Sequence, residues 1–158
     1  MKIVSVDVGT RNLAIAIYLG NKLTFFHCYD LLSYAKKKKE RTDYCLLVYN
    51  FIQAHPELFQ GMHKILIENQ IQRRMVVIAT SLRCFFYSKA VKISPLAVHN
   101  HFKSGTGNHR QNKKAAIKLV ERFVTKKQLE TIRSHKKKDD ICDAVIQIVY
   151  YLQKNSKN

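Results

Sequence analysis

The chain opens with Met1-Lys2-Ile3-Val4-Ser5-Val6-Asp7-Val8-Gly9-Thr10, and this stretch decides the fold. Its short apolar run ends at a glycine, which predicts a buried β-strand followed by a turn. The two-residue alternation of a strand places Asp7 on the same face as Ile3 and Ser5. An unpaired buried carboxylate is costly to desolvate. Asp7 therefore either accepts hydrogen bonds from backbone amides of the following turn or binds a cation, and the segment alone leaves both interpretations open.

Length and composition predict one globular domain that acts on a polyanion. The 158 residues are 46% hydrophobic with 5 glycines and 2 prolines, which is enough to bury a core. We expect a single domain over residues 1–154 and a polar tail over 155–158. The net charge of +17 exceeds what solubility requires. Because the basic residues occur in clusters rather than along one amphipathic helix, nucleic acid is favoured over a membrane surface.

The cysteines indicate an intracellular, reducing location. There are 4 of them, far apart in the sequence and without the spacing of a zinc site: Cys28, Cys45, Cys84 and Cys142. No apolar run is long enough to span a membrane, so we expect no membrane partner. The chain begins directly with the predicted strand, so we expect no secretory signal peptide.

Hydrophobic periodicity predicts a mixed α/β fold. Residues 13–19 and 23–29, joined by a tight turn, extend the first strand into an antiparallel meander. Two further short strands complete a five-stranded sheet of three antiparallel strands followed by two parallel ones, and helices flank it. The later strands are expected at 65–67 and 91–94, the helices at 44–54, 74–89, 113–124 and 139–152, and a loop at 99–112.

Four carboxylates stand out in so basic a chain. Asp7 and Glu68 occur on or at the end of apolar strands, while Asp140 and Asp143 are neighbours on one face of the last predicted helix. Each has a structural explanation, such as helix capping by Asp139 or Asp140, or a solvated strand end at Glu68. Together, the four can converge at one edge of the sheet. Hard oxygen ligands of this kind hold Mg²⁺ or Mn²⁺, and two such ions promote phosphodiester cleavage.

Three motifs resemble RuvC-type Holliday-junction resolvases of the RNase H-like (retroviral-integrase) superfamily, most of all the poxvirus resolvases. They are VSVDVGTRNLA (4–14), ILIENQ (65–70) and KDDICDA (138–144), and the resemblance extends over almost the whole chain. It implies an RNase H-like fold. It also implies that four carboxylates ligate two Mg²⁺ ions, for which Mn²⁺ can substitute: Asp7, Glu68, Asp140 and Asp143. The three-residue spacing to Asp143 selects Asp140 over Asp139.

The resemblance also implies the reaction and the assembly. Relatives are metal-dependent endodeoxyribonucleases that resolve four-way junctions by paired symmetric nicks and leave 5′-phosphate ends. Symmetric nicks imply a homodimer, and the nearly all-apolar helix Met75–Phe86 is the predicted interface. The expected role is the processing of branched or concatemeric viral DNA in the host-cell cytoplasm.

The family has a functional lysine in a helix that follows a Gly-x-Gly loop. Here Gly105-Thr106-Gly107 precedes Lys113 and Lys114, and Lys114 fits the register better. A cation there would stabilise charge on the scissile phosphate; the alternative is a surface lysine at the start of an amphipathic helix. The further residues predicted to contact DNA are Lys103, Arg110, Lys113, Lys136 and Lys137.

Three other functions stay open on the residues alone. The carboxylates would equally serve a ribonuclease H that cuts RNA in RNA–DNA hybrids. The segment Asp7–Thr10 also resembles the first phosphate motif of actin-like and sugar kinases, but 158 residues leave no room for their second lobe. A non-catalytic DNA-binding protein would bind in a salt-dependent way without metal-dependent cutting. The preference for a four-way junction rests on the resemblance.

Overall fold

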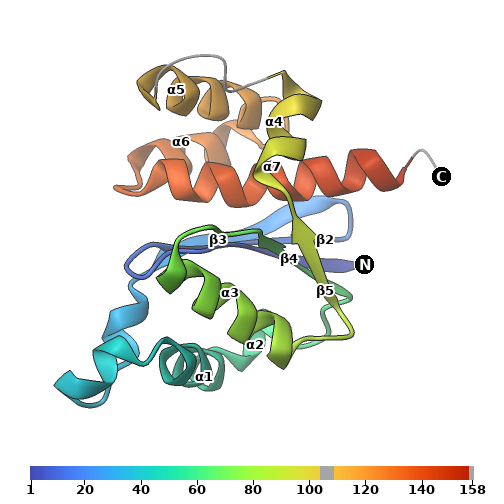
Figure 1. Cartoon of the computed structure of the whole chain (residues 1–158). Coiled ribbons are helices and arrows are strands. Elements are labelled where there is room, and N and C mark those ends of the chain that lie inside the picture. The colour runs from blue at the N-terminus through green and yellow to red at the C-terminus, as the bar shows by residue number, and fades with distance from the viewer. Residues whose placement is uncertain (104–108, 157–158) are drawn as a thin grey trace.

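The computed structural model describes residues 1–103 and 109–156, with the backbone alone at 109–113. The described residues form a five-stranded sheet in the order β3-β2-β1-β4-β5. The first three strands pair antiparallel, and β4 and β5 continue the sheet in parallel with β1 (Figure 1). The strands are β1 (Lys2–Asp7), β2 (Leu13–Leu19), β3 (Lys22–Tyr29), β4 (Lys64–Glu68) and β5 (Ala90–Ile93). This is the predicted mixed sheet, and it confirms the fold class.

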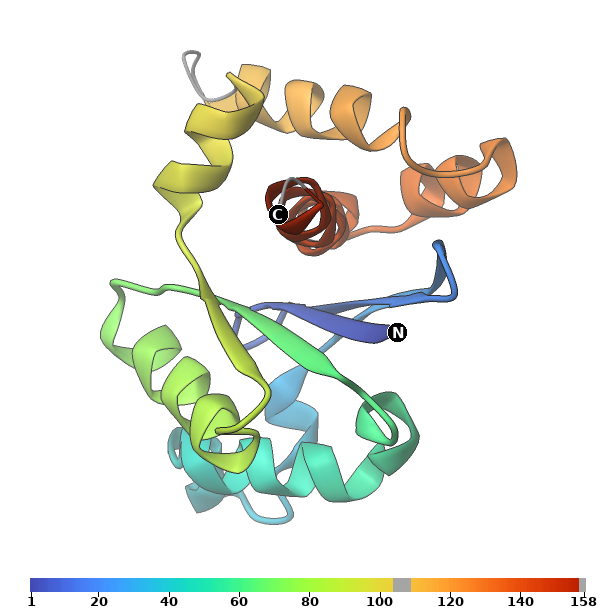
Figure 2. The ribbon, with the colours of Figure 1, turned by 90° about the vertical axis from the view of Figure 1, so that its right-hand side faces the viewer.

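Helices cover both faces of the sheet. The long helix α7 (Lys138–Asn155) crosses one face, and α4 (Pro95–Phe102), α5 (His109–Val120) and α6 (Lys126–Ser134) lie on that side (Figures 1 and 2). The other face carries α1 (Tyr44–Ala54), α2 (Pro56–Phe59) and α3 (Arg73–Phe85). Two 3₁₀ turns, η1 (Leu31–Tyr34) and η2 (Lys38–Thr42), connect β3 to α1.

The side-chain alternation of β1 divides the interior into two cores. Val4, Val6 and Val8 pack into the core beneath α1 and α3, whereas Ile3 packs into the core beneath α7. Ser5 is fully buried. The predicted alternation is confirmed, and it places Asp7, at the end of the same strand, on the face that α7 covers.

The region between β5 and α7 differs most from the prediction. Residues 99–112 were expected to be a loop, but α4 continues through Phe102 and α5 begins at His109 rather than Lys113 and ends at Val120. Pro95 occupies the first turn of α4, and Ser94 caps it by accepting a hydrogen bond from the Ala97 amide. The predicted Gly105-Thr106-Gly107 loop lies outside the described residues. The helices α2, α4 and α6 were not predicted because they are short, at four, eight and nine residues.

Two of the predicted helices also have different ends or exposure. The helix predicted at 74–89 ends at Phe85, and it buries one face only, through Ile78, Ala79, Ser81 and Leu82. The apolar residues of α3 outside this face are not buried within the single chain, and the predicted interface through this helix stays a prediction. The last helix continues through Asn155, three residues past the predicted end. In the described ranges, no helix has the length and hydropathy needed to cross a membrane.

The turn between β1 and β2 depends on Gly9. A Cβ atom at this position would lie 2.5 Å from the backbone oxygen of Asn12. We predict that Gly9→Ala lowers the free energy of unfolding by about 1–3 kcal/mol, because the backbone must shift to accept the methyl group. Urea denaturation measures this loss. Gly20→Asn is the control, since Gly20 has a φ of +56° with open space around it and asparagine tolerates that conformation. An unchanged denaturation midpoint in Gly9→Ala would contradict the prediction.

Candidate active site

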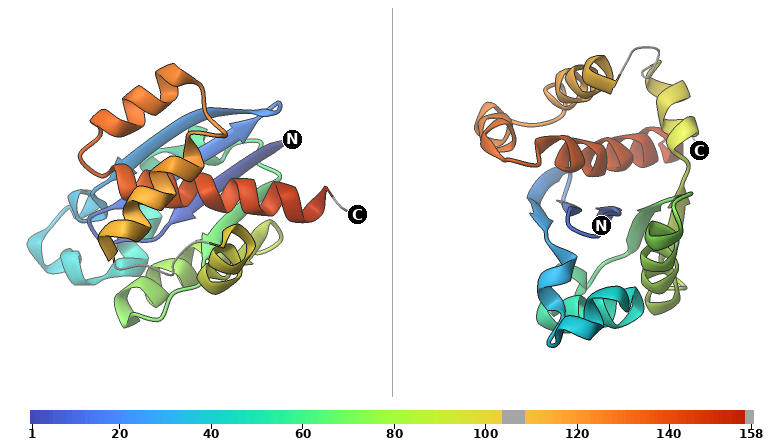
Figure 3. Two further views of the ribbon diagram at one scale, coloured as in Figure 1. Left: turned by 90° about the horizontal axis from the view of Figure 1, so that it is seen from above. Right: turned by 60° about the vertical axis from the view of Figure 1, so that its left-hand side comes forward.

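The predicted carboxylates gather at one edge of the sheet. Val6 pairs with Ile67 on the adjacent parallel strand, so Asp7 and Glu68, the last residues of β1 and β4, lie side by side. Asp140 occupies the first turn of α7. This edge is on the opposite side of the molecule from both termini, because β1 runs away from the N-terminus and α7 runs towards the C-terminus (Figure 1 and Figure 3, left).

The electrostatics of Asp7 show how close these groups are. Burial raises the pKa of Asp7 well above its ordinary range, and the charges of Glu68, Asp143 and Asp140 raise it further. A hydrogen bond from the Val8 amide opposes this shift. Asp7 therefore has the backbone partner expected of a turn carboxylate, but that partner does not outweigh desolvation and three neighbouring carboxylates. A cation would favour the ionised form of every member of this group.

The cluster is not a preassembled metal cage. Among the described residues, no group of three or more His, Cys, Asp and Glu side chains is arranged so that it would hold a metal ion as it stands. The four carboxylates are thus electrostatic neighbours. Their role as metal ligands remains a prediction.

Glu68 is held by two side-chain amides. Gln70 Nε2 donates to Glu68 Oε1 and Gln147 Nε2 donates to Glu68 Oε2, each over 3.2 Å. Ser5 Oγ in turn donates to Gln147 Oε1 over 3.0 Å. Burial raises the pKa of Glu68, and the two amide donors partly offset that rise. Gln147 was not predicted as a functional residue, because its one signal in the sequence is a polar side chain on an otherwise apolar part of α7.

Lys137 also belongs to this edge. When the Asn12 amide is oriented so that its nitrogen donates to the Arg11 carbonyl, its oxygen accepts from Lys137 Nζ over 3.2 Å. Burial raises the pKa of Cys28 to about 12, and the nearby charges of Asp140 and Asp7 add to the rise while Lys137 opposes it. Lys137 thus lies near both the turn after β1 and the carboxylates.

The other predicted basic residues are more dispersed. Lys114 is exposed on α5, Lys103 is exposed at the end of α4, and Lys136 is exposed just before α7. The side chains of Arg110 and Lys113 lie outside the described residues.

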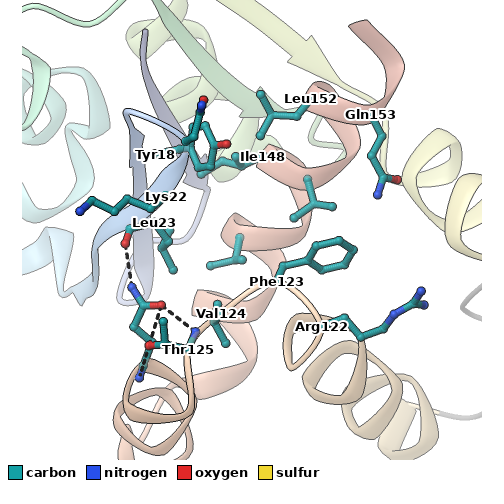
Figure 4. Close-up of a pocket in the computed structure, with 14 residues that line it drawn as sticks. Tyr18, Lys22, Leu23, Arg122, Phe123, Val124, Thr125, Ile148, Leu152 and Gln153 are labelled. Carbon is teal, nitrogen blue, oxygen red and sulfur yellow. Dashed lines mark hydrogen bonds between the residues drawn. The ribbon is translucent and has the colours of Figure 1, made fainter. Parts of the chain in front are cut away.

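A cavity of about 420 Å³ lies elsewhere on the molecule (Figure 4). It is formed by the β2–β3 turn, the α5–α6 connection and the C-terminal half of α7, and none of its lining residues is acidic. Its lining residues on α7 lie between Val145 and Gln153, towards the C-terminus from Asp140 and Asp143. The four carboxylates do not line this cavity.

Replacement of Asp7 should stabilise the protein when metal is absent. The pKa of Asp7 is raised in the folded state, so ionisation costs stability as the pH rises through that pKa, and the cost disappears below the ordinary value of about 4. We predict that Asp7→Asn gains on the order of 1 kcal/mol near neutral pH in a chelator and that the gain shrinks towards pH 4. Thermal unfolding between pH 4 and 8 measures this difference.

Asp43→Asn is the matched control for that series. Asp43 is exposed and caps α1 by accepting from the Leu46 amide, a role that asparagine fills equally well. A variant Asp7→Asn that is less stable than the unmodified protein across the whole pH range would contradict the assignment of a strained carboxylate.

A protein family and several solved structures are similar to this chain. Residues 1–154 match the family described as Poxvirus A22 protein. No curated protein sequence matches the chain. The crystal structure of the fowlpox virus Holliday junction resolvase superposes with a TM-score of 0.65 at 22% identity, covering 98% of this chain and 99% of that one.

Two complexes with DNA share the fold. The fowlpox virus resolvase with its substrate Holliday junction DNA has a TM-score of 0.68 at 22% identity, covering 98% of each chain. The T. thermophilus RuvC complex with a Holliday junction substrate has a TM-score of 0.56 at 13% identity, covering 98% of this chain and 96% of that one. The fold is thus that of RuvC-like proteins, and the match over residues 1–154 shows that the chain belongs to the Poxvirus A22 protein family.

Proposed function

We propose that this protein is a metal-dependent endonuclease that resolves four-way DNA junctions by paired symmetric nicks. The observation that carries the proposal is the carboxylate cluster at the ends of β1 and β4 and the start of α7, in a chain of net charge +17. The family supports it, as do the similar solved structures, which are Holliday junction resolvases, two of them with junction DNA. Residues 1–154 would form one nuclease domain.

The chemistry of the carboxylate cluster suits divalent metal ions. Asp7 is desolvated and feels the negative charges of three further carboxylates. All four side chains offer hard oxygen ligands, which suit Mg²⁺ and Mn²⁺. The residues that would hold two such ions are Asp7, Glu68, Asp140 and Asp143. When bound, the ions supply neutralisation of phosphate charge and activation of water, and cleavage would leave 5′-phosphate and 3′-hydroxyl ends.

Basic side chains around the cluster would bind and position the DNA. Lys137 lies at the cluster, where a point charge would stabilise a phosphate, and Lys114 on α5 remains the residue that the family pattern favours for this role. Phosphate contacts of Lys103, Arg110, Lys113 and Lys136 would add affinity without sequence preference. The family suggests that the substrate is branched or concatemeric viral DNA, processed in the host-cell cytoplasm.

A homodimer would place two such sites on one junction, and α3 offers the surface for it. Val76, on the side of α3 opposite its buried residues, is 38% exposed, and Phe85, the last residue of α3, is 46% exposed at the end of the helix. The Phe85 ring lies 6.1 Å from that of Tyr49 on α1, which is also exposed. This cluster of exposed apolar side chains is what an isologous interface requires.

Cleavage of a synthetic four-way junction in Mg²⁺ tests the proposed function. We expect symmetric nicks on the junction, and none on a matched linear duplex or RNA–DNA hybrid. Asp7→Asn should bind the junction without cutting it, while Lys114→Ala and Lys137→Ala should slow cutting, by about 100-fold for the lysine that touches the scissile phosphate. Lys22→Ala, at the far end of the sheet, is the control with equal loss of charge.

The possible results separate the candidate functions. Cutting of the hybrid alone would point to a ribonuclease H. Tight binding without cutting of any substrate in Mg²⁺ or Mn²⁺ would leave a DNA-binding protein with structural carboxylates.

Disruption of the α3 surface should separate the dimer. We predict that Phe85→Glu weakens association by about 2 kcal/mol or more, because it buries a charge at the centre of an apolar contact. Light scattering after gel filtration measures the mass of the particle in solution. In the cleavage assay, the nicks on the two opposing strands should no longer occur together. Leu96→Glu is the control, since Leu96 is 68% exposed on α4, on the other side of the sheet. A Phe85→Glu protein that stays dimeric would exclude this interface.

A further inference from the structure

Two of the three buried polar residues in the described chain belong to one hydrogen-bonded relay. Ser5 is 0% exposed and Gln147 is 2% exposed, and the third such residue, Ser81, lies on α3. The relay runs from Ser5 Oγ on β1 to Gln147 on α7 and from Gln147 to Glu68 on β4. It joins three elements that are far apart in the sequence, in the core beneath α7.

The direction of the relay is fixed by the carboxylate. An ionised Glu68 only accepts hydrogen bonds, so the amide nitrogen of Gln147 must face it and the amide oxygen must face Ser5. The Ser5 hydroxyl then donates to that oxygen. A flipped amide would set its oxygen against the carboxylate and lose the bond to Glu68, while the Ser5 hydroxyl could still accept from the amide nitrogen. The buried amide therefore has one favoured orientation. Its two hydrogen bonds, one at the nitrogen and one at the oxygen, compensate for the free-energy cost of removing it from water.

Glu68 consequently has a donor on each carboxylate oxygen. Gln147 holds Oε2 from the interior, and Gln70, in the loop after β4, holds Oε1. Two donors on opposite oxygens restrict rotation of the carboxylate plane and leave lone pairs on both oxygens for a further partner. Outer groups that orient a metal-ligating side chain in this way commonly change metal affinity by 10–100-fold when removed.

We infer that Gln147 is a positioning residue that, backed by Ser5, orients the Glu68 carboxylate towards a divalent cation. This inference rests on the proposed function, because it gives Glu68 a cation to hold. Gln147 itself contacts neither DNA nor metal. It acts through the plane and charge of Glu68.

The test compares metal affinity with catalysis and stability. Gln147→Met keeps the length of the side chain and removes both hydrogen bonds of the amide. We expect binding of Mn²⁺ to the DNA-free protein, followed by electron paramagnetic resonance, to weaken by about tenfold or more. The Mg²⁺ concentration for half-maximal junction cleavage should rise by a similar factor, with a much smaller change in rate at saturating Mg²⁺.

Two controls separate positioning from packing. Gln128→Met removes an amide that donates to the Leu23 carbonyl beside the distant cavity, and its Mn²⁺ affinity should match that of the unmodified protein. Ser5→Ala keeps the Gln147–Glu68 hydrogen bond but removes the hydroxyl that fixes the orientation of the Gln147 amide. It should therefore weaken Mn²⁺ binding less than Gln147→Met does. Should Gln147→Met fail to fold, Ser5→Ala carries the test, with Ser81→Ala as its control.

The outcomes distinguish the inference from the proposed function. Lower thermal stability of Gln147→Met with unchanged Mn²⁺ affinity would show a structural role and overturn the inference, while the nuclease function stands. An unmodified protein that neither binds Mn²⁺ nor cuts the junction would overturn the proposed function, and the inference with it.

Discussion

The packing of α7 on the sheet holds the carboxylate of Asp7 in a desolvated position. Burial and three neighbouring carboxylates oppose its ionisation, and one backbone amide supports it. The ionised carboxylate is therefore unfavourable here, and the surrounding apolar packing must keep it in place. The apolar face of α7, with Ile141, Ala144 and Ile148, is buried against the β1 and β2 strands and keeps the elements together. Hydrophobic burial thus stabilises the arrangement, and the carboxylates lower its stability near neutral pH.

A single strand face connects stability to chemistry. Ile3, Ser5 and Asp7 alternate along β1 towards α7: the first packs in the core, the second donates to Gln147 and the third carries the charge. The turn after β1 is tight because of Gly9, and it brings Asn12 to Lys137 at the start of α7. Asp7 and Lys137 are therefore both placed by the connection between two strands and one helix.

Much of this architecture follows from the sequence, and the exceptions have physical reasons. Alternation predicted β1 to β3, and the helical period between Asp43 and Pro56 predicted the bounds of α1. The helices α4 and α6 escaped prediction because they are only eight and nine residues long, and their starts are marked by capping residues, Ser94 for α4 and the Thr125–Gln128 capping box for α6. The carboxylates could be selected from the motifs, and the structure brings them together. Gln147 could not, because a hydrogen bond between residues 68 and 147 leaves no local pattern.

If the carboxylates of Asp7, Glu68, Asp140 and Asp143 hold divalent cations, anomalous diffraction from crystals grown with Mn²⁺ and junction DNA should locate them independently of any assay of cutting. We expect two anomalous peaks at the edge where β1, β4 and the start of α7 meet, each coordinated directly by carboxylate oxygens. Manganese bound elsewhere, with this edge empty and the DNA phosphates in place, would show that these carboxylates are not the metal ligands.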